Sequence, residues 1–147
     1  MPVKLHNVRK FLWLALLLCS AFAAWSWFRP YAWKVDPAAR CKIVGVEVKP
    51  DHAYFWVTAH LKVNPGEEHD LRKPVLLVTA SGIELEPADT TFGGTGKAGT
   101  TDIWLKFWLE SRQIADSLTL RINDGELSVK HHQGVPPAPA YFVTHRW

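Results

Sequence analysis

From Ala53 to Val63 the chain reads AYFWVTAHLKV, and its apolar core formers alternate with other residues at every second position. This period of two predicts a half-buried β-strand, because successive side chains of a strand point to opposite faces. The buried face would hold Phe55, Val57, Ala59, Leu61 and Val63. The opposite face would hold Tyr54, Trp56, Thr58, His60 and Lys62.

The same period recurs along most of the chain after Arg40. KIVGVEVK places Val44, Val46 and Val48 on one face, and PVLLVTA and IELEP predict two short strands around the Ser81-Gly82 turn. TTDIWLKFWL places Ile103, Leu105, Phe107 and Leu109 on one face and Trp104, Lys106 and Trp108 on the other. SLTLRI and ELSVKHH predict a hairpin across Asn123-Asp124-Gly125. LESRQIAD predicts one helical turn with Ser111 as its N-cap.

Seven short strands with frequent turns over about 90 residues are typical of an all-β fold. We therefore expect an antiparallel immunoglobulin-like β-sandwich over residues 41–133. The cysteine and tryptophan spacing of true immunoglobulin domains is not present in this sequence. Residues 134–147 read as a proline-rich, aromatic tail.

A different pattern occupies the N-terminus. Residues 1–10 are basic, and residues 11–28 carry no charge and are long enough to cross a bilayer as a helix. Trp13, Trp25, Trp27 and Trp33 resemble the aromatic belts of membrane interfaces. The basic side predicts a cytoplasmic N-terminus, a juxtamembrane linker over residues 29–40 and an extracytoplasmic main domain, periplasmic or extracellular. The alternative is a signal peptide cleaved at the Ala21-Phe22-Ala23 site, which would release a secreted domain.

Two cysteines bear on these alternatives. Leu18 is too bulky for the residue before a lipoprotein cysteine, so Cys19 reads as an apolar residue within the membrane. Cys41 is the remaining thiol of the exported domain. It reads as a small buried residue, and an intermolecular disulfide is the alternative.

The glycines of GGTGKAGT have the spacing of a dinucleotide-binding fingerprint at Gly94, Gly96 and Gly99. That fingerprint works only between a strand and a helix, because the helix N-terminus holds the pyrophosphate. Here a segment with strand periodicity follows the glycines. We therefore expect residues 88–100 to be a flexible connection between strands.

Charge and chemistry narrow the function further. The net charge of +3 is spread along the chain in runs of at most two basic residues, which argues against nucleic acid as a partner. The histidines have no paired spacing typical of metal ligands, and the serines lie in no nucleophile elbow. We expect no catalytic residues, no metal and no cofactor, and we interpret the histidines as solvated surface residues.

A family resemblance accompanies the strand pattern. The segments YFWVTAHLKV, VLLVTASGIELEP, GTTDIWLKFWLES and SLTLRI resemble a broad family of bacterial extracytoplasmic immunoglobulin-like, or telokin-like, domains that follow a membrane or lipid anchor. The resemblance covers roughly residues 41–130. It implies the sandwich fold and the anchor, and it transfers no site residue, because the family has no shared catalytic positions.

Eight tryptophans are the unusual feature of the composition. Tyr54, Trp56, Trp104 and Trp108 fall on faces opposite the predicted core, and we expect Trp104 and Trp108 to lie about 7 Å apart. Three occupants could cover such a face: the tail with Tyr141, Phe142 and Trp147, a protein partner, or a glycan. The leading hypothesis is a non-catalytic, membrane-anchored accessory protein that docks a partner protein or membrane complex. Its alternatives are a module that binds cell-wall or exopolysaccharide glycans and a metal-handling protein.

Overall fold

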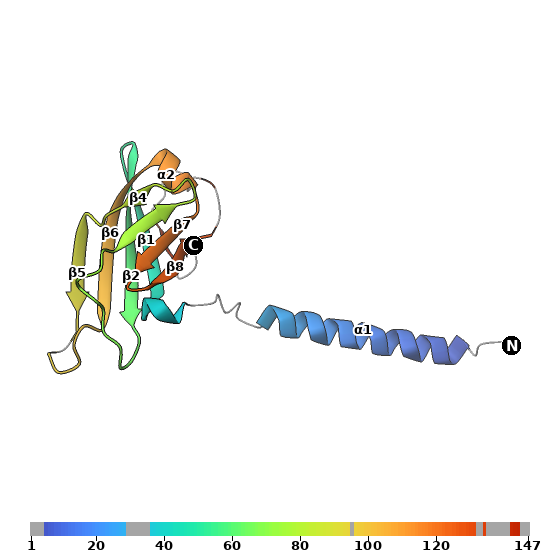
Figure 1. Ribbon diagram of the computed structural model, residues 1–147. Helices are drawn as coiled ribbons and strands as arrows, with labels where there is room; N and C mark the ends of the chain where they lie inside the picture. The colour runs from blue at the N-terminus through green and yellow to red at the C-terminus, as the bar shows by residue number, and fades with distance from the viewer. Residues whose placement is uncertain (1–4, 29–35, 95, 132–133, 135–141, 145–147) are drawn as a thin grey trace. The chain divides into compact units, whose positions relative to one another are not determined.

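The computed structural model describes residues 5–28, 36–94, 96–131, 134 and 142–144 (Figure 1). The chain divides into two compact units, Met1–Lys34 and Val35–Trp147. The first unit contains helix α1 (Leu5–Phe28), and its segment Val8–Trp25 is long and apolar enough to span a membrane or to serve as a signal sequence. The predicted N-terminal apolar helix is therefore confirmed.

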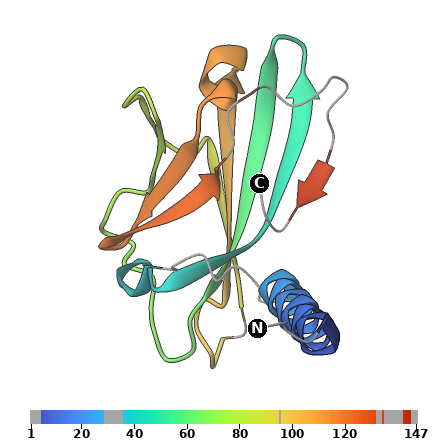
Figure 2. The ribbon, with the colours of Figure 1, turned by 90° about the vertical axis from the view of Figure 1, so that its right-hand side faces the viewer.

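The second unit is built from two antiparallel sheets, which Figure 2 shows as separate layers. The five-stranded sheet has the order β5-β6-β2-β1-β9, and the four-stranded sheet has the order β4-β3-β7-β8. The first sheet contains β1 (Cys41–Asp51), β2 (Tyr54–Val63), β5 (Asp89–Gly93), β6 (Asp102–Glu110) and β9 (Phe142–Thr144). The second contains β3 (Leu76–Thr79), β4 (Glu84–Leu85), β7 (Leu118–Ile122) and β8 (Gly125–Lys130). The expectation of a mostly β protein is confirmed.

One apolar core lies between the sheets. Strands β2 and β6 bury the alternate residues that the sequence assigned to their inner faces, including Val57 and Phe107. The four-stranded sheet contributes Leu77, Leu120 and Ile122 to the same cluster. Burying such side chains contributes roughly 1.5–3 kcal/mol each, so the inner faces fix which side of β2 and β6 meets water.

Strand β1 departs from simple alternation. Its pairing with β2 shifts register between Ile43 and Gly45, which inserts Val44 as a bulge. Val46 and Val48 are buried as expected, whereas Val44 is only half-buried and Ile43 packs against the core. The predicted common face of Val44, Val46 and Val48 is therefore wrong at Val44, because one extra residue reverses the alternation.

Three local assignments also need correction. The predicted connection over residues 88–100 contains β5, which pairs with β6 from Asp89 to Gly93. Helix α2 (Ser111–Ala115) is present, but its N-cap is Glu110, whose backbone N–H donates to Gln113 Oε1 at 2.8 Å. The predicted tail contains β9, which extends the sheet beyond β1.

The predicted linker also ends earlier than residue 40. Helix η1 (Pro37–Ala39) begins after Asp36, which caps it by accepting from the Ala38 N–H at 2.9 Å. Ala39 is fully buried in the domain core, and Asn123 Nδ2 donates to its carbonyl. Residues 36–40 therefore belong to the folded domain.

Candidate docking face on the five-stranded sheet

The central strands β2 and β6 decide what the outer face of the five-stranded sheet displays. Their antiparallel register sets Trp56 opposite Trp108, Thr58 opposite Lys106, and His60 opposite Trp104. Because the alternate residues of both strands are buried, these side chains all point away from the core. The structure thus brings Tyr54, Trp56, Trp104 and Trp108 onto one face.

At one end of this face, the Trp108 ring contacts two other rings. The centroid of the Trp108 ring lies 4.2 Å from that of Tyr54 and 5.9 Å from that of Trp56, and the two indoles are stacked. Lys106 Nζ lies over the Trp56 ring, 4.4 Å from its centroid, and Trp56 Nε1 donates to Asp51 Oδ2 at 3.0 Å. We call Tyr54, Trp56, Lys106 and Trp108 the Trp108 cluster. Trp108 is 49% exposed, and the other three members are half-buried.

A second group lies farther along the same strands. The rings of His60 and Trp104 are stacked with centroids 4.5 Å apart. His60 Nε2 lies 2.9 Å from Asp102 Oδ1, and Thr101 Oγ1 donates to the other carboxylate oxygen at 2.7 Å. These hydrogen bonds, from Thr101 first and His60 second, lower the pKa of Asp102. The Trp104 ring also lies over Gly93, where a Cβ would come within 2.7 Å of it.

The expected 7 Å separation of Trp104 and Trp108 is wrong. Four residues of strand separate them, which corresponds to about 14 Å at roughly 3.4 Å per residue. Each indole therefore contacts a different set of neighbours. Trp104 is half-buried, with its ring stacked on His60 and close to Gly93, whereas Trp108 keeps half of its surface open.

The sequence did not predict that His60 bonds Asp102 and stacks on Trp104. It interpreted His60 as a solvated histidine, but the side chains of both residues are only about one-third exposed, at 34% and 27%. The signal lies in the register of β2 against β6, which sets Lys62 opposite Asp102 and His60 opposite Trp104. Strand periodicity alone does not give that register.

The described part of the tail does not lie across the Trp108 cluster. Strand β9 pairs with β1, so β1 and β2 both separate it from β6. Phe142 occupies a β9 position opposite Val48 in the backbone register. Tyr141 and Trp147, the other tail residues expected on the docking face, lie outside the described residues.

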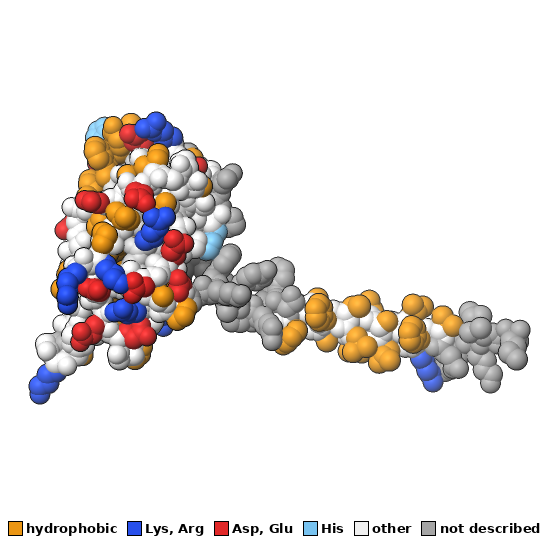
Figure 3. Space-filling model, viewed as in Figure 1, with side chains coloured by type: hydrophobic (Ala, Val, Ile, Leu, Met, Phe, Trp, Pro, Cys, Tyr) orange, Lys and Arg blue, Asp and Glu red, His pale blue; other side chains and the backbone are white. Residues whose placement is uncertain are grey.

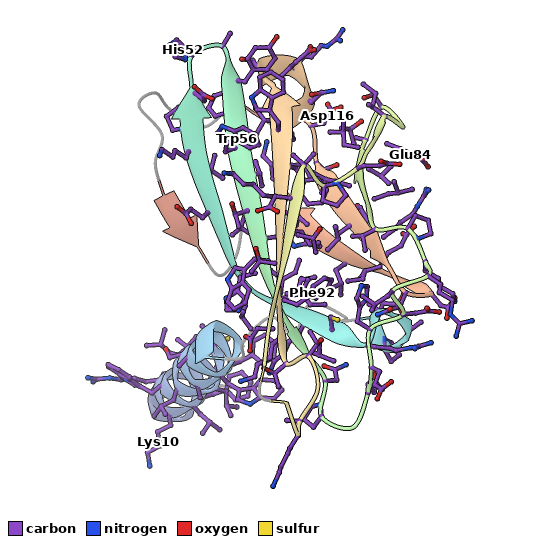
Figure 4. The ribbon with its side chains drawn as sticks, turned by 90° about the vertical axis from the view of Figure 1, so that its left-hand side faces the viewer. Lys10, His52, Trp56, Glu84, Phe92 and Asp116 are labelled. Carbon is purple, nitrogen blue, oxygen red and sulfur yellow. The ribbon has the colours of Figure 1, made fainter. Side chains whose placement is uncertain are left out.

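The opposite face of the domain has a different character. On the four-stranded sheet, Arg121 Nη1 lies 2.6 Å from Glu84 Oε1, and its Nε lies 3.2 Å from Glu126 Oε1. Figure 3 shows acidic and basic side chains interspersed over this face. Exposed ion pairs of this kind contribute little stability and keep a surface soluble. The rings of Tyr54 and of the three tryptophans of β2 and β6 thus share one face, and Figure 4 labels Trp56 there on β2 and Glu84 on the other side.

A buried lysine joins β8 to the segments around it. Lys130 is 2% exposed, and its ammonium donates to the carbonyls of Ile114 and, at 2.6 Å, Gly134. Burial lowers the pKa of Lys130. Gly134 N–H in turn donates to the Ala115 carbonyl at 2.8 Å. Lys130 therefore ties the end of α2 to the chain that continues toward β9.

The Cys41 thiol lies inside the core. Cys41 is fully buried in the core, and burial, aided by Glu67, raises the pKa of its thiol to about 11. This agrees with the interpretation of Cys41 as a small buried residue rather than with an intermolecular disulfide.

Among residues 5–28, 36–94, 96–131, 134 and 142–144, no three His, Cys, Asp or Glu side chains come together as a metal site.

The fingerprint glycines belong to the hairpin between β5 and β6. Gly93 pairs with Asp102, and the Thr101 N–H donates to the Gly93 carbonyl at 2.8 Å, which closes the loop. Gly94 adopts a positive φ, and a Cβ there would lie 2.1 Å from the Gly99 carbonyl oxygen. Gly94 therefore serves the loop that joins the two strands, and the element that follows these glycines is strand β6.

Two of the four tryptophans assigned to the membrane interface have described side chains. Trp13 and Trp25 lie in α1 with their side chains exposed, as do its apolar neighbours Phe11 and Leu17. The side chain of Trp27 and the whole of Trp33 lie outside the described residues.

Comparison of the chain with protein-family models, curated proteins and solved structures gave no match.

Proposed function

We propose that this protein is a non-catalytic, membrane-anchored accessory protein, whose immunoglobulin-like domain docks a partner protein through the Trp108 cluster. Helix α1 is its anchor, with the basic N-terminus in the cytoplasm and the domain on the other side of the membrane. Two antiparallel sheets of five and four strands around one core support the immunoglobulin-like assignment.

The exposed indole of Trp108 is the observation that carries this proposal. Trp108 is half-exposed beside Tyr54 and Trp56, whereas Trp104 is half-buried with its ring stacked on His60. Tryptophan and tyrosine are enriched among the residues that dominate protein interfaces, where truncation of one of them costs 2 kcal/mol or more, to order of magnitude. A rigid strand pair presents these rings with little conformational entropy to lose on binding.

The ring geometry favours a protein partner over a glycan. A sugar stacks on a free aromatic face, but Trp56 and Trp108 are stacked on each other, and Lys106 lies over Trp56. An apolar protein surface can instead pack against the exposed part of Trp108 and displace water from it.

Co-purification tests the docking face. Tagged full-length protein is isolated from membranes in a mild detergent, and the wild type is compared with Trp108→Ala. Leu71→Ala is the matched control, because Leu71 is 75% exposed and lies outside the five-stranded sheet. We expect a stoichiometric partner with the wild type and Leu71→Ala and its loss with Trp108→Ala. Equal recovery with all three proteins, or isolation of the wild type as a lone monomer, would contradict the proposal.

A binding titration separates the glycan alternative. Tryptophan fluorescence is followed while common cell-wall polysaccharides are added to the purified protein. We expect no shift in emission. A saturable shift that disappears in Trp108→Ala would replace the protein partner with a glycan at this face.

A further inference from the structure

Strand β9 forms one edge of the five-stranded sheet and is short. It pairs with three of the eleven residues of β1, from Val46 to Val48. On its other side, β1 pairs with β2 from Cys41 to Asp51. An edge strand held at three positions opens at a much lower free energy than the sheet that it borders.

The chain that leads to β9 is fixed at Gly134. Its N–H and carbonyl are held by Ala115 and by the buried ammonium of Lys130. Seven residues lie between Gly134 and Phe142. Release of β9 can therefore stop at Gly134, and the chain from there to Phe142 can reach about 26 Å when it is extended.

An opened β1 edge would be a template for another strand, because its peptide groups are already held extended by β2. The structure identifies one sequence that fits this edge: residues 142–144, antiparallel, with Val143 opposite Glu47. A second copy of the chain carries the same segment. Exchange of identical strands preserves the backbone ladder contacts, so its main cost is the entropy lost when two copies associate.

We propose that β9 exchanges between two copies of this chain. Residues 142–144 of each copy then add to the β1 edge of the other, in the register seen within one chain. The product is a symmetric dimer joined at its β1 edges. This dimer does not depend on Trp108, since β6 lies on the far side of β2 from β1. The proposed membrane anchor would favour exchange by confining both copies to one bilayer.

Disulfide trapping between differently tagged copies tests the exchange. One full-length chain carries Glu47→Cys and the other Val143→Cys, both with Cys19→Ala because Cys19 is exposed on α1. Directly opposed strand residues are close enough for a disulfide. After co-expression and oxidation in the membrane, we expect a reducible heterodimer that carries both tags. In the control, Lys62→Cys on β2 replaces Glu47→Cys, and the heterodimer should fall several-fold.

The proposal fails if the heterodimer does not exceed that control. A single chain with both Glu47→Cys and Val143→Cys provides the second readout. A disulfide confined to one chain, or no disulfide at all, also overturns the exchange, because β9 then stays in its own sheet or does not pair with β1. Trp108→Ala should leave the heterodimer unchanged, so failure of the docking proposal is distinguishable from failure of the exchange.

Discussion

At the scale of single residues, Gly125 is needed for a reason that the turn prediction did not include. The Asn123-Asp124-Gly125 hairpin is present, with Ile122 paired to Gly125. Yet Asn123 has the positive φ, and Gly125 is required by packing. A Cβ at Gly125 would lie 2.2 Å from Ala39 N and 2.7 Å from Ala38 C, so helix η1 would have to move.

We therefore expect Gly125→Ala to lower the free energy of unfolding by roughly 1–3 kcal/mol, as in other overpacked sites. Gly96→Ala is the matched control, because a Cβ at Gly96 meets nothing within 4 Å. Its effect should stay within about 0.5 kcal/mol. Urea denaturation of the purified proteins measures both. Equal stability of the two variants would show that η1 does not pack on Gly125.

The lowered pKa of Asp102 predicts how the stability of the folded protein changes in acid. Its pKa is lowered from the usual 3.8 by Thr101 and His60, so its ionised form stabilises the folded protein. That contribution is fully present above about pH 4 and is lost as the pH falls through the lowered folded value. Wild type should therefore lose more stability than Asp102→Asn when the pH is reduced from 5 to about 2. Parallel pH profiles of thermal unfolding would contradict this assignment.

At the scale of elements, the sequence predicted those strands that bury one full face. In β2 and β6 every second residue is buried, so the period of two is strong. Strand β5 was not predicted because it is a short edge strand, with Asp89 and Phe92 both exposed and no buried residue along it. Strand β9 was not predicted because it lies in a proline-rich tail, and its partner β1 is nearly one hundred residues away in sequence. The bulge at Val44 and the register of His60 against Trp104 depend on tertiary pairing, which periodicity does not encode.

The tail makes two separable contributions to stability. A chain that stops after Tyr141 loses β9 but keeps Gly134, whereas one that stops after Gln133 also removes the carbonyl that Lys130 contacts. We expect the longer truncation to destabilise the domain by roughly 1–3 kcal/mol, because a buried ammonium loses a partner. The shorter truncation should have the smaller effect. Thermal unfolding of the two proteins checks the order, and a reversed order would show that Lys130 does not depend on Gly134.

At the scale of the whole molecule, the two units have separate physical tasks. The core cluster of the second unit is drawn from residues between Ala39 and Val129. The apolar side chains of α1 are exposed instead, including Phe11, Leu14 and Phe22. A helix of this length and apolarity can span a bilayer or serve as a signal sequence.

Residues 35–147 expressed alone should therefore fold into a soluble domain with a single cooperative unfolding transition. The full chain should remain in the membrane fraction during alkaline carbonate extraction, because about 18 apolar residues hold it there. Mass spectrometry of the extracted protein distinguishes an anchor from a signal sequence: an intact N-terminus supports the anchor, and a chain that begins after Ala23 identifies a cleaved signal. A domain that unfolds without cooperativity when α1 is absent would show that the helix is needed for folding and not only for anchorage.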